Sequence, residues 1–369
     1  MGQKFQTTKH GALPYQTIVD LISARCIIGA KEGNVKPSSL DLSLSREVYS
    51  VEGIFQPRKA ETVREVLEQI RKKKHDISVP LKRGQMYMVR LNETLALPRD
   101  VYAFCNPKST SGRMDMHVRL LADRVSRYDS VTRGFKGELW VSVVPNTFSV
   151  LLHEGLSLNQ LRFFNTDTRL SDVDIERAMK QHKLLWNGQT SKAYKSSDIS
   201  IRDNDGSIIL TLDLESTVLG YEAMPTQETV DLSRIGAYNA KKFFKPVSCK
   251  NGFLYLKKDA FYILSTHEAV RVPPELACEM LPMDERSGDF RSHYAGFIDP
   301  GWGWGKRGEE KGRTLTLEVR PFEDLIVRQG QPIAKIRFER MAEVPTHVYD
   351  TLSSNYSVQK GPKLAKHFK

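Results

Sequence analysis

The chain has 369 residues, of which 40% are hydrophobic and 27% are charged, a balance typical of globular proteins that bury a core. No apolar run approaches the roughly 18 to 20 residues that span a bilayer, and residues 1–5 lack the apolar centre of a signal peptide, so we expect a cytoplasmic protein with no membrane partner. The formal net charge of +11 favours a polyanionic partner, and a nucleoside triphosphate satisfies that charge as well as nucleic acid does.

Most segments are short alternating or β-branched runs broken by Gly, Pro, Asn and Asp, which predicts a mainly β protein. Three peripheral helices are predicted, over residues 15–26, 60–74 and 172–186. In the second helix the basic run 71–74 comes last, as the helix dipole favours, so we interpret it as a solvated helix end rather than a nucleic-acid patch. The turn residues 203–206 predict a hairpin that joins 199–201 to 208–212.

The segment 81–98 reappears without a gap as 256–273, an offset of 256 − 81 = 175 residues. A period this long indicates duplication of a whole globular unit rather than a solenoid, whose repeats run roughly 20 to 50 residues. We therefore expect two domains, residues 1–167 and residues 168–369, and the predicted helix 172–186 links them.

The cysteines do not form a metal-binding pattern. They are widely separated, with no C-x-x-C pair and no nearby H-x-E, and they are Cys26, Cys105, Cys249 and Cys278. Neither a zinc ribbon nor the zinc-deaminase signature is present, so we expect reduced structural thiols and no zinc.

Two stretches outside the repeat place polar groups in tight turns. Residues 106–113 combine hydroxyls, Gly112 and two cations, Lys108 and Arg113. This loop either holds the oxygens of a triphosphate or is an ordinary polar turn. Asp299 follows a hydrophobic strand end, where it is either a carboxylate held at the rim of a site or the cap of a turn.

Two further stretches lie near the C-terminus. In residues 314–319 a predicted strand places Glu318 among hydrophobic neighbours. There it either faces solvent or is buried, in which case desolvation raises its pKa toward that of a useful base. Residues 355–363 form a polar, basic tail that is either disordered or closes over a bound anion.

Taken in chain order, these stretches resemble the dCTP deaminases of the trimeric dUTPase-like superfamily, and the resemblance covers most of the chain. Pro-Ser-Ser-Leu-Asp-Leu at 37–42 is similar to an early motif of that family. Lys-Ser-Thr-Ser-Gly-Arg at 108–113 is similar to its phosphate loop, with Lys in place of the first Arg. The strongest match is Ile-Asp-Pro-Gly at 298–301 followed by Leu-Thr-Leu-Glu at 315–318, and the tail from Tyr356 is similar to the family's closing arm.

The resemblance implies two tandem dUTPase-like domains of the β-clip or jelly-roll type, with the phosphate loop in the first and the catalytic glutamate and closing tail in the second. Glu318 matches the catalytic glutamate. The residues that the resemblance implies for nucleotide binding are Lys108, Ser109, Thr110, Ser111, Gly112, Arg113, Ser287, Arg291, Asp299, Thr316, Leu317, Tyr356, Gln359 and Lys360. It implies no metal held by the protein, with magnesium carried on the triphosphate.

The two copies retain different motifs. Alignment on the proline that follows each strand places Ser142 opposite Glu318, whereas the fixed offset of 175 places Val143 there, and neither is a carboxylate. In the second copy, residues 286–291 keep only the outline Arg-Ser-x-x-x-Arg of the phosphate loop. We therefore expect the chemistry in the second copy, and the sequence leaves open which of the two loops serves Glu318.

The function that the resemblance implies is hydrolytic deamination of dCTP to dUTP and ammonia in the supply of dTTP, by an enzyme that needs no zinc. Glu318 is the expected proton shuttle, and Ser109 or Ser287 the hydroxyl that helps to position the water. The alternative is a dUTP pyrophosphatase, or a bifunctional enzyme that releases dUMP, in which Asp299 activates water against the α-phosphate.

A further alternative is a non-catalytic nucleic-acid-binding or regulatory protein, which the net charge of +11 allows. The resemblance also implies a homo-oligomer built on trimers, with dTTP as a feedback inhibitor, and makes nucleic acid the less expected partner.

Overall fold

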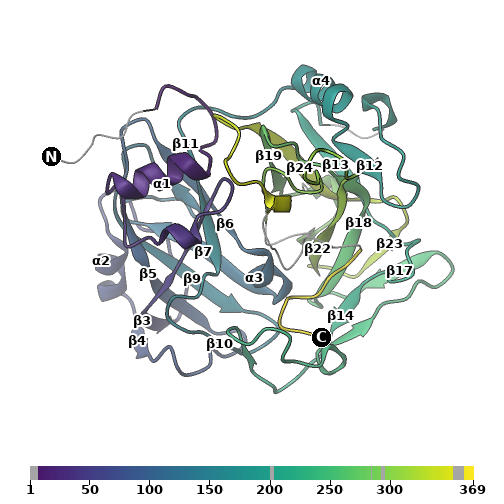
Figure 1. Ribbon diagram of the computed structural model, residues 1–369. Coiled ribbons are helices and arrows are strands. Elements are labelled where there is room, and N and C mark those ends of the chain that lie inside the picture. Colours follow the sequence, from purple (N-terminus) through teal and green to yellow (C-terminus); the bar gives the residue numbers. More distant parts are fainter. Residues whose placement is uncertain (1–6, 200–202, 284, 292–295, 352–360) are drawn as a thin grey trace. The chain divides into compact units, whose positions relative to one another are not determined.

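The computed structural model describes residues 7–199, 203–283, 285–291, 296–351 and 361–369 (Figure 1). The chain divides into two compact units. Unit 1 is the chain up to Asp167 together with Pro225–Tyr238 and Ala365–Lys369, and unit 2 is Thr168–Met224 together with Asn239–Leu364. Two short segments that follow residue 168 therefore belong to unit 1.

Unit 1 contains two main sheets. The larger runs in the order β4-β3-β5-β9-β7, with β1 also paired to β5. Its strands are β1 (Ile27–Ile28), β3 (Leu44–Val51), β4 (Lys72–His75), β5 (Met86–Ala96), β7 (Met116–Ala122) and β9 (Lys136–Pro145). The smaller runs β2-β11-β6-β8. Its strands are β2 (Leu40–Leu42), β6 (Tyr102–Pro107), β8 (Ser130–Val131) and β11 (Asn159–Phe164), and β10 (Val150–Leu151) pairs separately with β15 (Val230–Asp231).

The two main sheets of unit 2 repeat the strand order of those in unit 1. Its larger sheet runs β16-β14-β18-β22-β20, with β12 also paired to β18, and its smaller sheet runs β13-β24-β19-β21. The larger sheet contains β12 (Leu185–Asn187), β14 (Tyr221–Ala223), β16 (Phe244–Pro246), β18 (Tyr262–Val270), β20 (Phe290–Arg291) and β22 (Arg313–Pro321). The smaller contains β13 (Ser207–Thr211), β19 (Leu276–Leu281), β21 (Phe297–Ile298) and β24 (Pro332–Arg340), and β17 (Phe253–Leu256) pairs with β23 (Leu325–Arg328).

Strands dominate both units, which confirms the mainly β prediction. The α-helices of the described residues are α1 (Tyr15–Ser23), α2 (Val63–Gln69), α3 (Ser109–Arg113) and α4 (Asp172–His182). Short 3-10 turns occupy Glu32–Asn34, Ser196–Asp198, Ala240–Lys242, Glu285–Ser287 and Tyr349–Thr351. In the part of the chain that the structure describes, no helix is both long and apolar enough to cross a membrane.

The second predicted helix is shorter than its sequence pattern indicates. α2 ends at Gln69 because Ile70 adopts extended backbone (φ −107°, ψ 161°), and the basic residues that follow form β4. The prediction that residues 71–74 end a helix is therefore wrong: they lead into and form an edge strand, in which Lys74 lies opposite Tyr49 of β3. Pairing with the backbone of β3 outweighs the helix propensity of lysine.

The region where unit 2 begins follows its predictions in part. α4 starts with a capping box formed by Ser171 and Asp174, and it ends where Lys183 adopts left-handed backbone (φ 50°). β13, the second arm of the predicted hairpin, pairs with the distant β24, with Ile208 opposite Ile336. Residues 200 and 201 of the first arm lie outside the described part of the chain.

Candidate functional site

Glu318 lies on β22, which pairs with β18 along one edge and with β20 at its end. Three alternate side chains of β22 lie in the hydrophobic core of unit 2: Leu315, Leu317 and Val319. Since side chains of a strand alternate between its faces, Thr314, Thr316 and Glu318 share the opposite face. Only 2% of Glu318 is exposed, which excludes the solvent-facing alternative. Because the Leu317 side chain is in the core, any contact from this residue to a nucleotide must come from its backbone.

The C-terminal tail returns to this face of β22. The backbone N–H of Gly361 donates to Thr314 Oγ1 over 3.1 Å, and the N–H of Lys363 donates to Thr316 Oγ1 over 3.2 Å. Thr316, a predicted nucleotide-binding residue, therefore uses its hydroxyl to hold the tail. The predicted tail residues Tyr356, Gln359 and Lys360 lie outside the described residues.

Asp299 stands in a turn that begins directly after β21. The turn is tight: Gly301 has a φ of +90°, and a Cβ at this position would lie 2.8 Å from Val348 Cβ. The backbone N–H of Tyr349 donates to the Pro300 carbonyl over 2.8 Å. These contacts fix the backbone next to Asp299, whose residue as a whole is half-buried. Asp299 follows a strand of the smaller sheet, whereas Glu318 lies in the larger one.

The predicted phosphate loop of unit 1 is a short helix, α3, that follows Lys108. The Lys108 ammonium pairs with the carboxylate of Asp41, so the structure brings together the motifs at 37–42 and 108–113. Ser111 Oγ donates to the Leu158 carbonyl over 2.7 Å. Three residues of the stretch are buried, Ser111, Gly112 and Arg113, whereas Lys108, Ser109 and Thr110 are half-buried.

Residues 286–291 of unit 2, which keep the outline of the phosphate-loop motif, do not align residue for residue with the motif at 108–113. Asp115 and Asp289 occupy matching positions, because their carbonyls accept the N–H of Asn146 and of Phe322, respectively, just beyond β9 and β22. In the same register Phe290 lies opposite Pro321 as Met116 lies opposite Pro145. Two predicted nucleotide-binding residues are placed by this register: Arg291 takes the position of His117, and Ser287 takes the position of Arg113. The outline Arg-Ser-x-x-x-Arg thus does not bring an arginine to the place of Arg113.

Sheet register also decides which residue of unit 1 matches Glu318. Ser142 lies opposite Met88 on β5, and Glu318 lies opposite Ile263 on β18. Since 88 + 175 = 263, Met88 and Ile263 are equivalent in the repeat, and Ser142 is the counterpart of Glu318. The alternative, Val143, lies opposite Tyr87 and points to the other face.

In unit 1, bulky side chains cover the face of β9 that corresponds to the Glu318 face of β22. Trp140, at the position of Thr316, is fully buried and packs in a cluster with Val63 and Leu67 of α2. The guanidinium of Arg64 lies 5.3 Å from the centre of the Trp140 ring and 2.8 Å from the Glu138 carboxylate. Unit 1 therefore lacks the carboxylate of this site, and α2, which has no counterpart among the α-helices of described unit 2, packs against the matching face.

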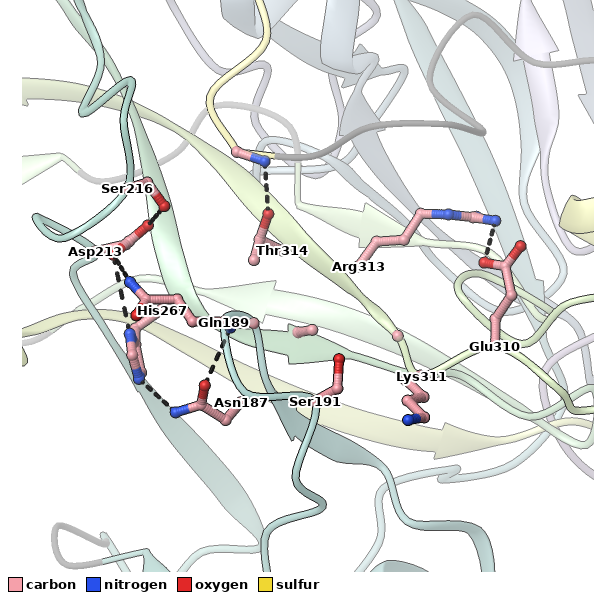
Figure 2. A pocket seen from close by; sticks show the side chains of 14 residues that line it. Asn187, Gln189, Ser191, Asp213, Ser216, His267, Glu310, Lys311, Arg313 and Thr314 are labelled. Atoms are coloured by element: carbon pink, nitrogen blue, oxygen red, sulfur yellow. Dashed lines mark hydrogen bonds and ion pairs between the residues drawn. The ribbon is translucent and has the colours of Figure 1, made fainter.

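A cavity of about 550 Å³ opens in unit 2 beside the first residues of β22 (Figure 2). Thr314 and Gly361 line one side of it, so the point where the tail meets β22 forms part of the wall. Glu318 is not among the lining residues; four residues of strand, about 13 Å, separate it from Thr314.

His267 of β18 and Asp213 also line this cavity, where they lie next to each other (Figure 2). His267 Nδ1 lies 3.9 Å from Asp213 Oδ1, and Nε2 lies 2.9 Å from the amide of Asn187. The Asp213 carboxylate raises the pKa of His267 above its ordinary value. Sequence reasoning missed this pair, although one signal was present: Asn92 stands at the position of His267 in the other copy of the repeat.

Within the described residues, no three His, Cys, Asp or Glu side chains are grouped so as to hold a metal ion. A magnesium ion carried by the phosphates of a substrate needs no such group, because it takes most of its ligands from phosphate oxygens and water.

Family models of 2'-deoxycytidine 5'-triphosphate deaminases match both halves of the chain, the N-terminal domain over residues 9–167 and the C-terminal domain over residues 174–368. The chain is also similar to the crystal structure of 2'-deoxycytidine 5'-triphosphate deaminase from Agrobacterium tumefaciens. The TM-score is 0.83 and the sequence identity 31%, and the match covers 91% of this chain and 97% of that chain. No curated protein sequence matches the chain. The structural likeness confirms the predicted fold of two tandem dUTPase-like domains.

Proposed function

Because the chain belongs to the 2'-deoxycytidine 5'-triphosphate deaminase family, we propose that it is an enzyme that deaminates dCTP to dUTP and ammonia, and that Glu318 moves the protons of the reaction. The observation that supports this role is the place of the carboxylate. Glu318 is buried on the one face of β22 that carries no core residues, and the matching position of unit 1 holds Ser142.

Deamination adds water at C4 of the cytosine, places a proton on N3 and then protonates the departing amine. The oxygen of water bonds to C4 as it loses a proton, and the C4–N bond breaks as ammonia leaves. One group must therefore accept a proton and return it, a role worth roughly 10² to 10⁴ in rate. Glu318 fills this role in the proposal, with Ser109 or Ser287 as the hydroxyl that helps to hold the water, and no zinc is used.

The substrate is proposed to be the magnesium complex of dCTP, in which the ion bridges triphosphate oxygens. Lys108 and Arg113 bind the phosphates in this proposal, because unit 1 keeps both cations at α3 whereas unit 2 has Ser287 at the position of Arg113. Asp299 and the backbone of residues 316–317 line the pocket for deoxyribose and cytosine in this proposal. Assembly into trimers, inhibition by dTTP and a cytoplasmic location stay predictions.

Purified protein incubated with dCTP and magnesium is expected to release ammonia and to accumulate dUTP, which chromatography separates from dUMP. Accumulation of dUMP with pyrophosphate would instead favour the bifunctional alternative, in which Asp299 activates water against the α-phosphate. Absence of turnover together with salt-sensitive binding to DNA or RNA would contradict the proposal and favour the binding protein.

Replacing Lys108 with alanine is expected to raise the KM for dCTP by about 10- to 100-fold, since a hydrogen bond to a charged phosphate contributes about 1.5 to 3 kcal/mol. Arg291→Ala is expected to change KM less, because Arg291 takes the position of His117 rather than that of Arg113. Steady-state kinetics of both variants measure this difference, and Lys59→Ala, which removes an exposed lysine of unit 1, is the control for the loss of one charge. A larger effect of Arg291→Ala would assign the phosphates to residues 286–291.

A further inference from the structure

The contact between the tail and β22 has an unusual form. Two backbone N–H groups spaced two residues apart, from Gly361 and Lys363, meet two threonine hydroxyls spaced two residues apart, on Thr314 and Thr316. Two residues of extended chain span roughly 6.6 Å on either side, so both hydrogen bonds form at once only when the tail runs along the strand. The tail is thus held in one register on the face that also carries Glu318.

Side-chain hydroxyls are the groups that can make this contact. The N–H and C=O groups of β22 lie in the plane of the sheet, where β18 pairs with Thr316 and Glu318. A segment that lies on the face of the sheet therefore finds no backbone acceptor there and must form its hydrogen bonds with side chains. Threonine suits both needs, because its β-branched side chain favours a strand and its hydroxyl accepts from an amide.

The other copy of the repeat lacks these hydroxyls. Glu138 and Trp140 stand at the positions of Thr314 and Thr316, and both are engaged by Arg64 of α2. The pair of threonines therefore belongs to the unit that carries Glu318.

Asp350 and Gly361, which lie on either side of residues 352–360 in the sequence, both bind to the same end of β22. Asp350 forms an ion pair with Arg313, and Gly361 bonds to the next residue, Thr314. The bond at Thr314 also lies in the wall of the 550 Å³ cavity. A shift of Gly361 would therefore change the shape of this cavity as well as the path of the tail.

We propose that Thr314 and Thr316 are positioning residues, whose hydroxyls clamp residues 361–363 onto the Glu318 face of β22, and that this contact is needed for tight binding of dCTP. The proposal rests on the proposed deaminase function. It assigns the two hydroxyls to the tail rather than to direct contact with the nucleotide.

The test compares valine and serine at these positions. Thr314→Val and Thr316→Val keep the shape of the side chain and remove the hydroxyl, and each is expected to raise the KM for dCTP about fivefold, the double variant about 25-fold, with a smaller change in kcat. The C-terminal segment should also become more sensitive to limited proteolysis. Thr314→Ser and Thr316→Ser keep the hydroxyl and should restore KM and protection.

Two outcomes would overturn the clamp. Valine variants with wild-type KM and wild-type proteolysis would show that the hydroxyls do not hold the tail, and serine variants as impaired as the valine variants would show that the methyl groups matter instead. Thermal unfolding of each variant shows whether a change in KM or in proteolysis is caused by loss of the fold instead. If the buried Thr316 tolerates no substitution, the half-buried Thr314 still gives a single variant that folds. Failure of the deaminase proposal would appear differently, as absence of ammonia release from the unmodified protein.

Discussion

Replacing Glu318 with glutamine is expected to lower the rate of dCTP deamination by about 10²- to 10⁴-fold while the nucleotide still binds. Glutamine keeps the size and shape of the side chain and one acceptor oxygen, with an NH2 group in place of the other oxygen, so the packing around this buried position changes little. What it loses is the ability to take a proton from water and return it. The measurement is ammonia release at saturating dCTP, together with calorimetric titration of the variant with dCTP and magnesium.

Glu268 gives a matched control on the neighbouring strand β18. Its carboxylate is also buried, burial raises its pKa, and it accepts hydrogen bonds of 2.7 Å from both the N–H and the hydroxyl of Thr211. Glu268→Gln should therefore act mainly on thermal stability. A Glu318→Gln variant with an unchanged rate would remove Glu318 from the mechanism, whatever the control shows.

The repeat made much of the fold predictable. A fixed offset of 175 residues matches β5 with β18, and the structure confirms that the two units share one strand order. The offset fails by one residue at β9 and β22, where 142 + 176 = 318. Sequence alone left Ser142 and Val143 as alternatives, and only the pairing of β9 with β5 decides between them, because a shift of one residue moves every side chain to the other face.

Long-range packing accounts for what the sequence did not predict. The packing over β9 in unit 1 depends on α2 lying against Trp140, a contact between segments more than 70 residues apart in the chain. The same holds for His267 and Asp213, which no local pattern joins. The basic run 71–74 has the composition of a helix end, yet pairing with β3 makes most of it a strand. In each case tertiary contacts outweigh local propensity.

Loss of the Asp350 carboxylate is expected to destabilise unit 2 strongly. This carboxylate forms a two-pronged ion pair with Arg313, in which Nη2 lies 3.0 Å from Oδ2, and it also accepts the N–H of Gly305 over 2.8 Å. The side chains of Asp350 and Arg313 are 3% and 8% exposed. Breaking such a buried pair costs about 3 to 5 kcal/mol, because the remaining charge stays out of water without its partner. The loss of unfolding free energy caused by Asp350→Ala is expected at the lower end of this range, since Arg313 keeps its ion pair with Glu310.

Tryptophan fluorescence during urea unfolding measures this loss, because three of the four tryptophans, Trp186, Trp302 and Trp304, belong to unit 2. Arg286→Ala is the matched control: it breaks an Arg–Asp pair of 3.0 Å whose arginine is 74% exposed, and exposed pairs contribute about 0 to 1 kcal/mol. Equal effects of the two variants would contradict the prediction.

Replacing both partners, by Arg313→Met with Asp350→Leu, should recover part of the stability, because no unpaired charge then remains buried.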